Sequence, residues 1–326
     1  MSELSIVMYH YVRDLRRSRY PEIKGLDVAL FREQLAYFKK HYRVISAYDL
    51  MDAVEDESPL PPRALMLTFD DGYVDHFAEV FPLLHREKLP GCFFPPARAV
   101  EENLVLDVNK IHFVLASVED KDVLVDYIYR ALDEARTEYQ LQPNEFYWNK
   151  CGVEGRYDPP AVMFVKRTLQ RDLPLQLRRD ITNRLFTRFV SSDEASFSKE
   201  LYMSLDQLSC LQSSGMYVGS HGFNHYWLDA IPQQEQEVEI DQSLKFLERV
   251  GSSSERWIMC FPYGGYNESL LSVLEARNCT VGLTTEQGMV DLANDNPLAM
   301  SRLDTNDLPK AANSEPNEWT KRAIRA

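Results

Sequence analysis

Residues 64–72, ALMLTFDDG, decide the fold: an almost wholly apolar run leads directly into two aspartates and a glycine. A run of this kind is typical of a strand buried on both faces, as in a parallel sheet. Parallel α/β folds place their active sites at the carboxyl ends of such strands. Asp70 and Asp71 therefore stand where a metal ligand beside a general base would be useful, although a bare Asp-Asp-Gly turn is more often just two solvated carboxylates.

On both sides of this stretch, short apolar runs alternate with segments of helical periodicity. Strands are expected at residues 4–9, 43–46, 92–94, 216–220, 257–261 and 280–283. Helices are expected at residues 28–42, 47–55, 74–88, 205–214, 233–250 and 268–277. This alternation indicates right-handed β-α-β units in a parallel sheet, closed or open. It stops between residues 97 and 203, where only helical periodicity continues, and a segment of that length is too large for an ordinary loop.

Composition excludes several classes of protein. Hydrophobic residues make up 44% of the 326 residues and charged residues 26%, as in globular proteins. The formal net charge of -14 offers no overall positive field for phosphate backbones, so we expect no nucleic-acid partner. No apolar run approaches the roughly 20 residues of a membrane span, and the N-terminus has no signal-peptide pattern. We therefore expect a cytoplasmic protein.

The five cysteines are scattered along the chain and form no Cys-x-x-Cys pair. This spacing favours reduced, mostly buried thiols over a disulfide framework or a zinc-finger site.

Two further motifs follow predicted strands. Residues 220–225, SHGFNH, place His221 and His225 four positions apart, a spacing at which two imidazoles can bind one ion if the segment is helical. Residues 260–266, CFPYGGY, form a proline turn whose glycines allow backbone N–H groups to face a ligand. Each motif alone is weak, since the first occurs without a metal and the second is an ordinary strand-end turn.

Taken together and in this order, the motifs resemble the polysaccharide deacetylase family (carbohydrate esterase family 4, with the NodB-like fold). TFDDG matches the family's first motif, HxxxH its second and FPYG its third. The resemblance covers roughly residues 4–94 and 205–303. The segments VMYHYV at residues 7–12, GLTT at 282–285 and SRL at 301–303 are similar to the branch that includes deacetylases of biofilm and surface glycans.

The resemblance implies an α/β fold, a distorted (β/α) barrel of about seven strands. We expect a single catalytic domain over residues 1–326. It would carry a helical insertion at about 97–203 and a polar, loosely held C-terminal tail at about 308–326. The insertion would shape specificity or form an oligomer interface.

The resemblance also implies roles for the motif residues. Asp71, His221 and His225 would bind one divalent ion, with zinc as the first expectation and cobalt or nickel as alternatives, because ligand type does not decide among them. Asp70 would take the proton from an ion-bound water. The backbone N–H of Tyr263, held by the turn at Pro262, would help to bind the oxyanion.

The chain departs from the family pattern in two places. The third motif usually carries an arginine that contacts the base aspartate, and residues 259–261 are Met-Cys-Phe instead. The usual general-acid histidine is replaced by Thr-Thr at residues 284–285. Similarity to the biofilm branch implies that His10 serves as the general acid. It also implies that Arg302 approaches the metal-site carboxylates, near the oxyanion and the substrate. His112, at the start of the insertion, would contact the substrate.

The expected function is metal-dependent hydrolysis of an N-acyl amide, most simply N-acetyl, on a sugar. A cytoplasmic location would favour a nucleotide-linked or lipid-linked intermediate of lipopolysaccharide, capsule or another surface glycan. The alternatives are an N-deformylase or other deacylase, a catalytically inactive glycan-binding homologue, and a ring-amide hydrolase of the wider superfamily. The retained Asp70 argues against the inactive homologue, and the different metal motifs of the ring-amide hydrolases argue against the last.

Overall fold

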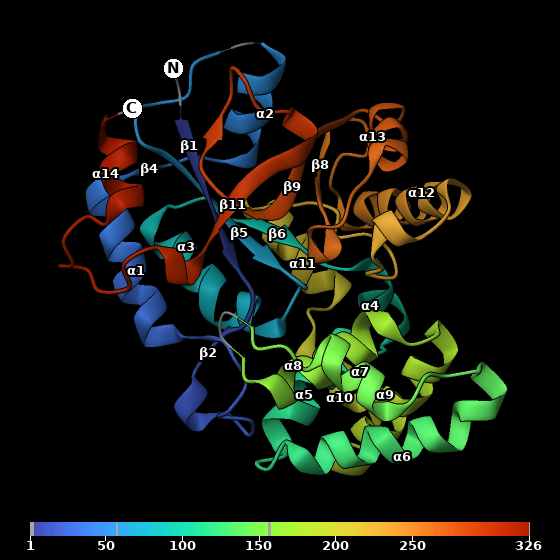
Figure 1. Ribbon diagram of the computed structural model, residues 1–326. Helices are drawn as coiled ribbons and strands as arrows, with labels where there is room; N and C mark the ends of the chain where they lie inside the picture. Colours follow the sequence, from blue (N-terminus) through green and yellow to red (C-terminus); the bar gives the residue numbers. More distant parts are fainter. Residues whose placement is uncertain (1–2, 57, 156–157, 326) are drawn as a thin grey trace. The chain divides into compact units, whose positions relative to one another are not determined.

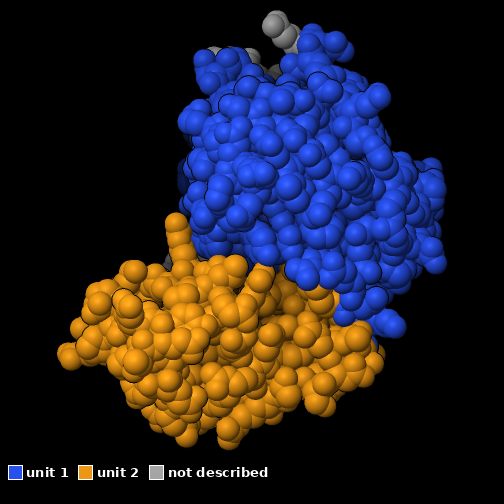
Figure 2. Space-filling view, turned by 90° about the vertical axis from the view of Figure 1, so that its right-hand side faces the viewer, with its two compact units in different colours: residues 1–14, 25–103, 199–326 blue, residues 15–24, 104–198 orange. Residues whose placement is uncertain are grey.

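The computed structural model describes residues 3–56, 58–155 and 158–325. The ends of the predicted domain, residues 1–2 and 326, lie outside the described residues. The chain forms two compact units, coloured separately in Figure 2. The barrel unit comprises residues 1–14, 25–103 and 199–326, and the helical unit comprises residues 15–24 and 104–198.

The barrel unit is built on a mainly parallel sheet. Its strands are β1 (Glu3–Tyr9), β4 (Arg43–Val44), β5 (Ala64–Asp70), β6 (Cys92–Phe94), β7 (Tyr217–Val218), β8 (Trp257–Cys260), β9 (Cys279–Gln287), β10 (Val290–Asp291) and β11 (Met300–Asp304). The continuous order is β7-β6-β5-β1-β11-β9-β8, with β4 beside β5 and β10 antiparallel to β1. Figure 1 shows β5 and β11 on either side of β1. A small separate sheet pairs β2 (Val12–Arg13) with β3 (Leu26–Asp27).

The sheet curls back on itself at its carboxyl end. A parallel bridge joins Ser220, just past β7, to Met259 in β8, so the two ends of the strand order meet there. The Ser220 carbonyl accepts a hydrogen bond from the Cys260 N–H at 2.8 Å. The predicted barrel-type α/β fold is confirmed, with seven strands along the continuous order.

Strand β5 is buried along its whole length, as its apolar run predicts. Ala64 and Met66 pack in one cluster with alternate residues of β1, β6, β8 and β9, whereas Leu65 and Phe69 pack in another cluster with residues of α1 and α12. Because side chains alternate along a strand, Asp70 shares the face of Met66. Asp70 is thereby placed on the inner face of the barrel, at its carboxyl end.

Helices surround the sheet in the barrel unit. They are α1 (Val28–His41), α2 (Ala47–Glu55), α3 (Phe81–Glu87), α4 (Ala97–Glu102), α11 (Leu205–Ser213), α12 (Gln233–Val250), α13 (Glu268–Glu275) and α14 (Glu318–Arg325). Reciprocal capping boxes start α2, at Ser46 and Asp49, and α11, at Ser204 and Gln207. The helix predicted over residues 74–88 is confirmed over residues 74–87, with a π-helical turn, His76–Val80, leading into α3.

The polar C-terminal segment is held more firmly than the expected loose tail. Its helix α14 lies beside α1 in Figure 1. The hydroxyls of Tyr37 and Tyr42 donate to the fully buried Thr320 hydroxyl at 2.9 and 3.0 Å. Polar residues in this segment therefore serve as anchors, which composition alone does not show.

The helical unit contains α5 (Asp107–Ser117), α6 (Asp122–Tyr139), α7 (Asn144–Cys151), α8 (Pro160–Arg167) and α9 (Leu175–Phe189). A π turn, Thr168–Asp172, lies between α8 and α9, and α10 (Glu194–Leu201) runs from this unit into the barrel unit. Phe197 packs edge-to-face on Phe113 and Phe186, with ring centroids 4.9 and 5.2 Å away. Among the described residues, no helix is both long enough and apolar enough to cross a membrane.

Candidate metal centre

The turn after β5 brings both aspartates to the mouth of the barrel. Asp71 and Gly72 have φ angles of 68° and 65°, in the left-handed region. A Cβ at Gly72 would lie 2.7 Å from the Cβ of Pro95, so only glycine fits there. Asp71, by contrast, is a non-glycine residue in a strained conformation, which is uncommon and concentrated at functional sites.

The two histidines come from a loop that begins at the end of β7. The segment is not helical, so they do not meet by the helical spacing that the sequence suggested. Left-handed residues at Gly222 and His225 fold the loop back instead. Glu239 of α12 stabilises the fold-back by accepting hydrogen bonds from the backbone N–H groups of Phe223 and Asn224 at 3.2 and 2.8 Å.

Asp71, His221 and His225 converge on one point. Asp71 Oδ1 lies 3.4 Å from His221 Nε2 and 3.3 Å from His225 Nε2. His221 Nδ1 is 2.7 Å from the Cys260 carbonyl oxygen. Since a carbonyl can only accept, Nδ1 carries a proton, which leaves Nε2 as the nitrogen of His221 that could bind an ion. The three side chains thus present one carboxylate oxygen and two imidazole nitrogens, a donor set typical of catalytic zinc sites.

The chemistry of Asp71 supports this fit. Within the described part of the chain, its buried Oδ1 has no hydrogen-bond partner, which is costly for a charged oxygen unless a cation faces it. Burial raises the pKa of Asp71, but His221 and His225 outweigh it and hold the pKa well below its usual value. Asp71 is therefore ionised and its Oδ1 faces the two imidazoles, as a metal ligand would.

A second trio, Asp70, His221 and Cys260, also has donor atoms within ligand reach of one another. It fits an ion less well. Both Asp70 oxygens accept hydrogen bonds from Arg302. Burial raises the pKa of the Cys260 thiol, and a thiol binds metals as the thiolate. The Asp71 set is the better candidate.

Asp70 forms a two-pronged ion pair with Arg302 of β11. The guanidinium Nη1 and Nη2 lie 2.9 and 2.8 Å from the two carboxylate oxygens. Arg302 also donates to the Thr284 carbonyl at 2.7 Å and to the Thr68 hydroxyl at 3.1 Å. Burial raises the pKa of Asp70, yet Arg302 and then His221 and His10 lower it below its usual value. Arg302 is 1% exposed, so its guanidinium, which is paired with Asp70, is not available to a substrate.

His10 lies just past the end of β1, at the edge of the site. Its ring is 42% exposed and its Nε2 is 3.9 Å from Asp70 Oδ2. The His10 carbonyl accepts a hydrogen bond from Nε2 of the buried His76 at 2.7 Å. Burial lowers the pKa of His76 to about 4, against the opposing effect of this bond, so His76 is neutral.

The third motif forms the other side of the site. Pro262 is buried, and Tyr263 has a φ of 58° inside a 3-10 turn, Pro262–Gly264. The Tyr263 ring stacks on Trp227 with centroids 4.5 Å apart and planes 2° apart, and it meets the edge of His225 at 4.8 Å. The Thr285 hydroxyl donates to the Tyr263 carbonyl at 3.3 Å. Thr284 and Thr285 stand where the family usually has its acid histidine. Thr285 supports Tyr263, and Thr284 supports Arg302.

Comparison with known proteins decides the family. The chain matches the family model described as polysaccharide deacetylase over residues 57–136 and 142–282, more than half of its length. The chain belongs to the polysaccharide deacetylase family.

Individual relatives are distant. The poly-beta-1,6-N-acetyl-D-glucosamine N-deacetylase of Escherichia coli (strain K12) is 31% identical over 90 residues, which are 27% of this chain and 13% of that protein. The match therefore spans well under two thirds of this relative.

Solved structures show the same fold. The deacetylase PplD from Streptococcus pyogenes, in complex with acetate, aligns with a TM-score of 0.57 at 15% identity over 93% of this chain and 92% of its own. IcaB from Ammonifex degensii aligns with a TM-score of 0.54 at 16% identity over 99% and 96%.

Among the predicted site residues, the structure brings together those of the barrel unit. Asp71, His221 and His225 meet, as do Asp70, His10 and Arg302. His112 lies half-buried on α5 of the helical unit, and its role in substrate contact stays a prediction.

Sequence reasoning missed three supporting residues: Tyr73, His76 and Glu239. The Tyr73 hydroxyl donates to Asp71 Oδ2 at 2.5 Å. One signal could have found Glu239, since it lies beside Ile240 and between Gln236 and Ser243 on the buried face of α12, where a carboxylate needs a partner.

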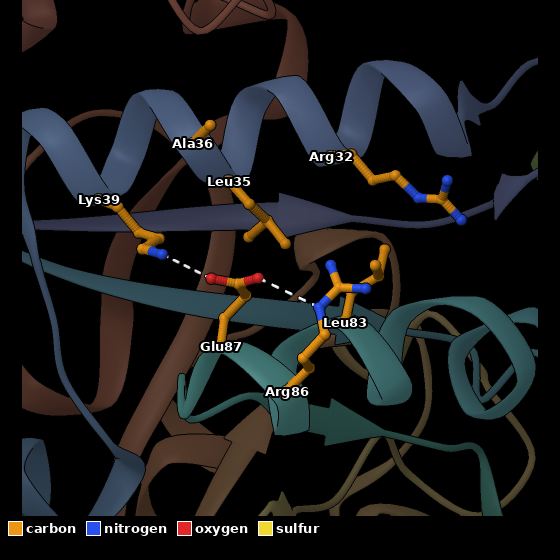
Figure 3. A pocket seen from close by; sticks show the side chains of 7 residues that line it. All are labelled: Arg32, Leu35, Ala36, Lys39, Leu83, Arg86 and Glu87. Carbon is orange, nitrogen blue, oxygen red and sulfur yellow. Dashed lines mark hydrogen bonds and ion pairs between the residues drawn. The ribbon is translucent and has the colours of Figure 1, made fainter.

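A groove elsewhere on the barrel unit is lined by residues of α1 and α3 and encloses about 210 Å³. Figure 3 shows Glu87 there between Lys39 and Arg86, at 2.5 and 3.2 Å. Exposed ion pairs of this kind contribute little to the free energy of unfolding. None of the predicted site residues lines the groove.

Proposed function

We propose that this chain is a metal-dependent deacetylase that hydrolyses an N-acetyl amide on a glycan. The observation that carries the proposal is the buried, unpartnered Oδ1 of Asp71, which faces Nε2 of His221 and of His225 at 3.4 and 3.3 Å. Two comparisons support the substrate class: the E. coli relative is named for an N-acetylglucosamine polymer, and the S. pyogenes structure holds acetate.

Asp71, His221 and His225 would hold one divalent ion, zinc first. When bound, such an ion lowers the pKa of water and polarises an acyl carbonyl. The geometry leaves Asp70 beside the ligands without using it as one, which fits a separate role as the base.

Asp70 would accept the proton of the attacking water. Its lowered pKa keeps it ionised at neutral pH, and Arg302 fixes the plane of its carboxylate. Each carboxylate oxygen has two lone pairs, so one remains on each after the bonds to Arg302. The base is therefore both charged and oriented.

His10 would deliver a proton to the leaving amine, which is a poor leaving group without one. It is the exposed imidazole next to Asp70, so it can reach a bound substrate. The backbone N–H of Tyr263 would help to hold the developing oxyanion.

Two variants test these assignments. His221→Ala should lose both the metal and the activity, whereas Asp70→Asn should keep the metal and lose the activity. Metal is measured by elemental analysis, and activity as acetate release from an N-acetylglucosamine oligomer beside formate release from its N-formyl analogue. Absence of any divalent ion from the purified protein, with none taken up on addition, would contradict the metal. Faster release of formate than acetate would identify a deformylase.

We further propose that the glycan is an intermediate of surface-glycan assembly, of the lipopolysaccharide or capsule type. Similarity to the biofilm branch supports a surface glycan, but the E. coli relative is named for a polymer, so the substrate form needs its own test. Matched nucleotide-linked, lipid-linked and polymeric N-acetyl sugars should be compared by kcat/KM. A clear preference for the polymer would contradict an assembly intermediate.

A further inference from the structure

Tyr73 is a fully buried residue beside the metal ligands that the proposed chemistry does not use. Its hydroxyl donates to Asp71 Oδ2 at 2.5 Å, whereas Asp71 Oδ1 faces the two histidines. The two carboxylate oxygens of Asp71 therefore have different partners. Oδ2 accepts a hydrogen bond from Tyr73, and Oδ1 points to the proposed ion position. Hydrogen bonds to a carboxylate are short and strong compared with those between neutral groups.

The hydroxyl of Tyr73 is held in place by its ring and its backbone. The ring stacks on Tyr11 at 4.0 Å and on Tyr202 at 6.2 Å, with interplanar angles of 19° and 12°. A backbone bridge pairs Tyr73 with Tyr202, and the neighbouring Gly72 carbonyl accepts from the Met203 N–H at 2.9 Å. Three separate segments of the barrel unit thus fix the position of one oxygen atom.

Asp71 needs such a partner because its own torsions do not settle its orientation. Its backbone is fixed in the left-handed region at φ 68°, but the last torsion of an aspartate is broad and has no sharp preference. Without the Tyr73 hydroxyl, the carboxylate could rotate to present both oxygens to an ion. That rotation would use a coordination position that water or the acyl carbonyl needs.

We propose that Tyr73 is a positioning residue that holds Asp71 to a single metal-facing oxygen and thereby sets the metal affinity and coordination number of the site. The proposal rests on the proposed metal site. Partners that orient metal ligands in this way typically change metal affinity by about 10- to 100-fold when removed.

The test is Tyr73→Phe, which removes the hydroxyl and keeps the ring. The matched control is Tyr9→Phe: Tyr9 is equally buried, stacks on Phe69 and donates to Gln34 at 2.6 Å. Zn²⁺ affinity is measured by competition with a chromogenic chelator, and the coordination number from the visible spectrum of bound Co²⁺. We expect Tyr73→Phe to bind Zn²⁺ about 10- to 100-fold more weakly, with an altered Co²⁺ spectrum, and Tyr9→Phe to match the parent in both.

The outcomes separate the two proposals. A parent protein that binds no Zn²⁺ or Co²⁺ overturns the metal site itself. A parent that binds them, together with a Tyr73→Phe variant of equal affinity and spectrum, overturns only the role of Tyr73. If the metal-free variant does not stay folded, it is refolded with Co²⁺, and release of the ion into excess chelator is timed. Release as slow as from the parent would overturn the role, and faster release would support it.

Discussion

The floor and the rim of the site differ in how they are held. The floor, Asp70, Asp71, His221, His225 and Arg302, is at most 8% exposed. Hydrogen bonds orient four of its side chains, those of Asp70, Asp71, His221 and Arg302. The rim, His10, Trp227 and Tyr263, is partly exposed and held by backbone contacts and ring stacking.

Because of this difference, substitutions in the floor and in the rim should have different effects. A buried charge must be paired, so we expect each floor residue to affect folding as well as the proposed chemistry. An exposed ring costs little to remove, so a rim residue can be specialised for the substrate. Substitutions in the floor should therefore change stability and activity together, whereas substitutions in the rim should change activity alone.

The largest effect is expected from Arg302→Met. Removing one partner of a buried ion pair costs about 3–5 kcal/mol in the free energy of unfolding, measured by urea denaturation. Arg302 lowers the pKa of Asp70 and burial raises it, so the pKa should rise in the variant. The acid limb of the kcat/KM profile should then move to higher pH.

Arg256→Met is the matched control for this prediction. Arg256 is one-third exposed and pairs with Asp52 and Glu55, so its loss should cost less than about 1 kcal/mol. Equal costs for the two variants would show that the floor is not distinguished by its buried charge.

His10→Ala should lower activity on an amide by about 10²–10⁴-fold, the usual range for a general acid. The metal content should not change, and the free energy of unfolding should change by about 0.5 kcal/mol or less, because the side chain is 42% exposed. The loss should be smaller on an activated ester, whose leaving group needs no proton. Equal losses on both substrates would show that His10 positions the substrate instead.

His76 supports the backbone of the rim residue His10 and should make stability depend on pH. Its folded pKa of about 4 lies below the ordinary 6.5, so the unfolded chain binds a proton that the folded chain does not. The free energy of unfolding should therefore fall as the pH is lowered from about 6.5 to about 4, by up to about 3 kcal/mol from this residue.

The measurement is urea denaturation of His76→Gln across this pH range, where the dependence should be flatter by that amount. His85→Gln is the control, because His85 is exposed on the adjoining helix α3. An unchanged pH dependence in His76→Gln would mean that His76 is not buried as a neutral imidazole in solution.

The smallest effect is expected from Glu239→Gln. The change keeps the shape of the side chain but replaces one acceptor oxygen under the histidine loop, so metal affinity should fall by about tenfold. Titration with Zn²⁺ measures it, with Glu235→Gln on the exposed face of α12 as the control. Complete loss of Zn²⁺ binding would show that the metal site cannot form without Glu239.

Local hydrophobic patterns in the sequence predict the main helices and strands. The strand expected at residues 64–69 is Ala64–Asp70, and the helix expected at 233–250 is Gln233–Val250. Hydrophobic periodicity predicts these elements correctly because burial of one face of a helix, or of both faces of a strand, requires a pattern of apolar residues within a short window of sequence. The three motifs were found in the same way, since each is a short segment at a strand end.

The contacts that complete the site depend on the tertiary arrangement of the barrel. Arg302 reaches Asp70 across 232 positions of the chain because β11 and β5 both lie next to β1. Tyr73 contacts Asp71 through a turn of left-handed residues, and the histidine loop closes by backbone bends and a buried glutamate, not as a helix. Such pairings depend on the order of strands and on which buried charges lack a partner. Resemblance to the biofilm branch pointed to Arg302, and the buried face of α12 marks Glu239, but the partner that each one meets is fixed only when the barrel closes.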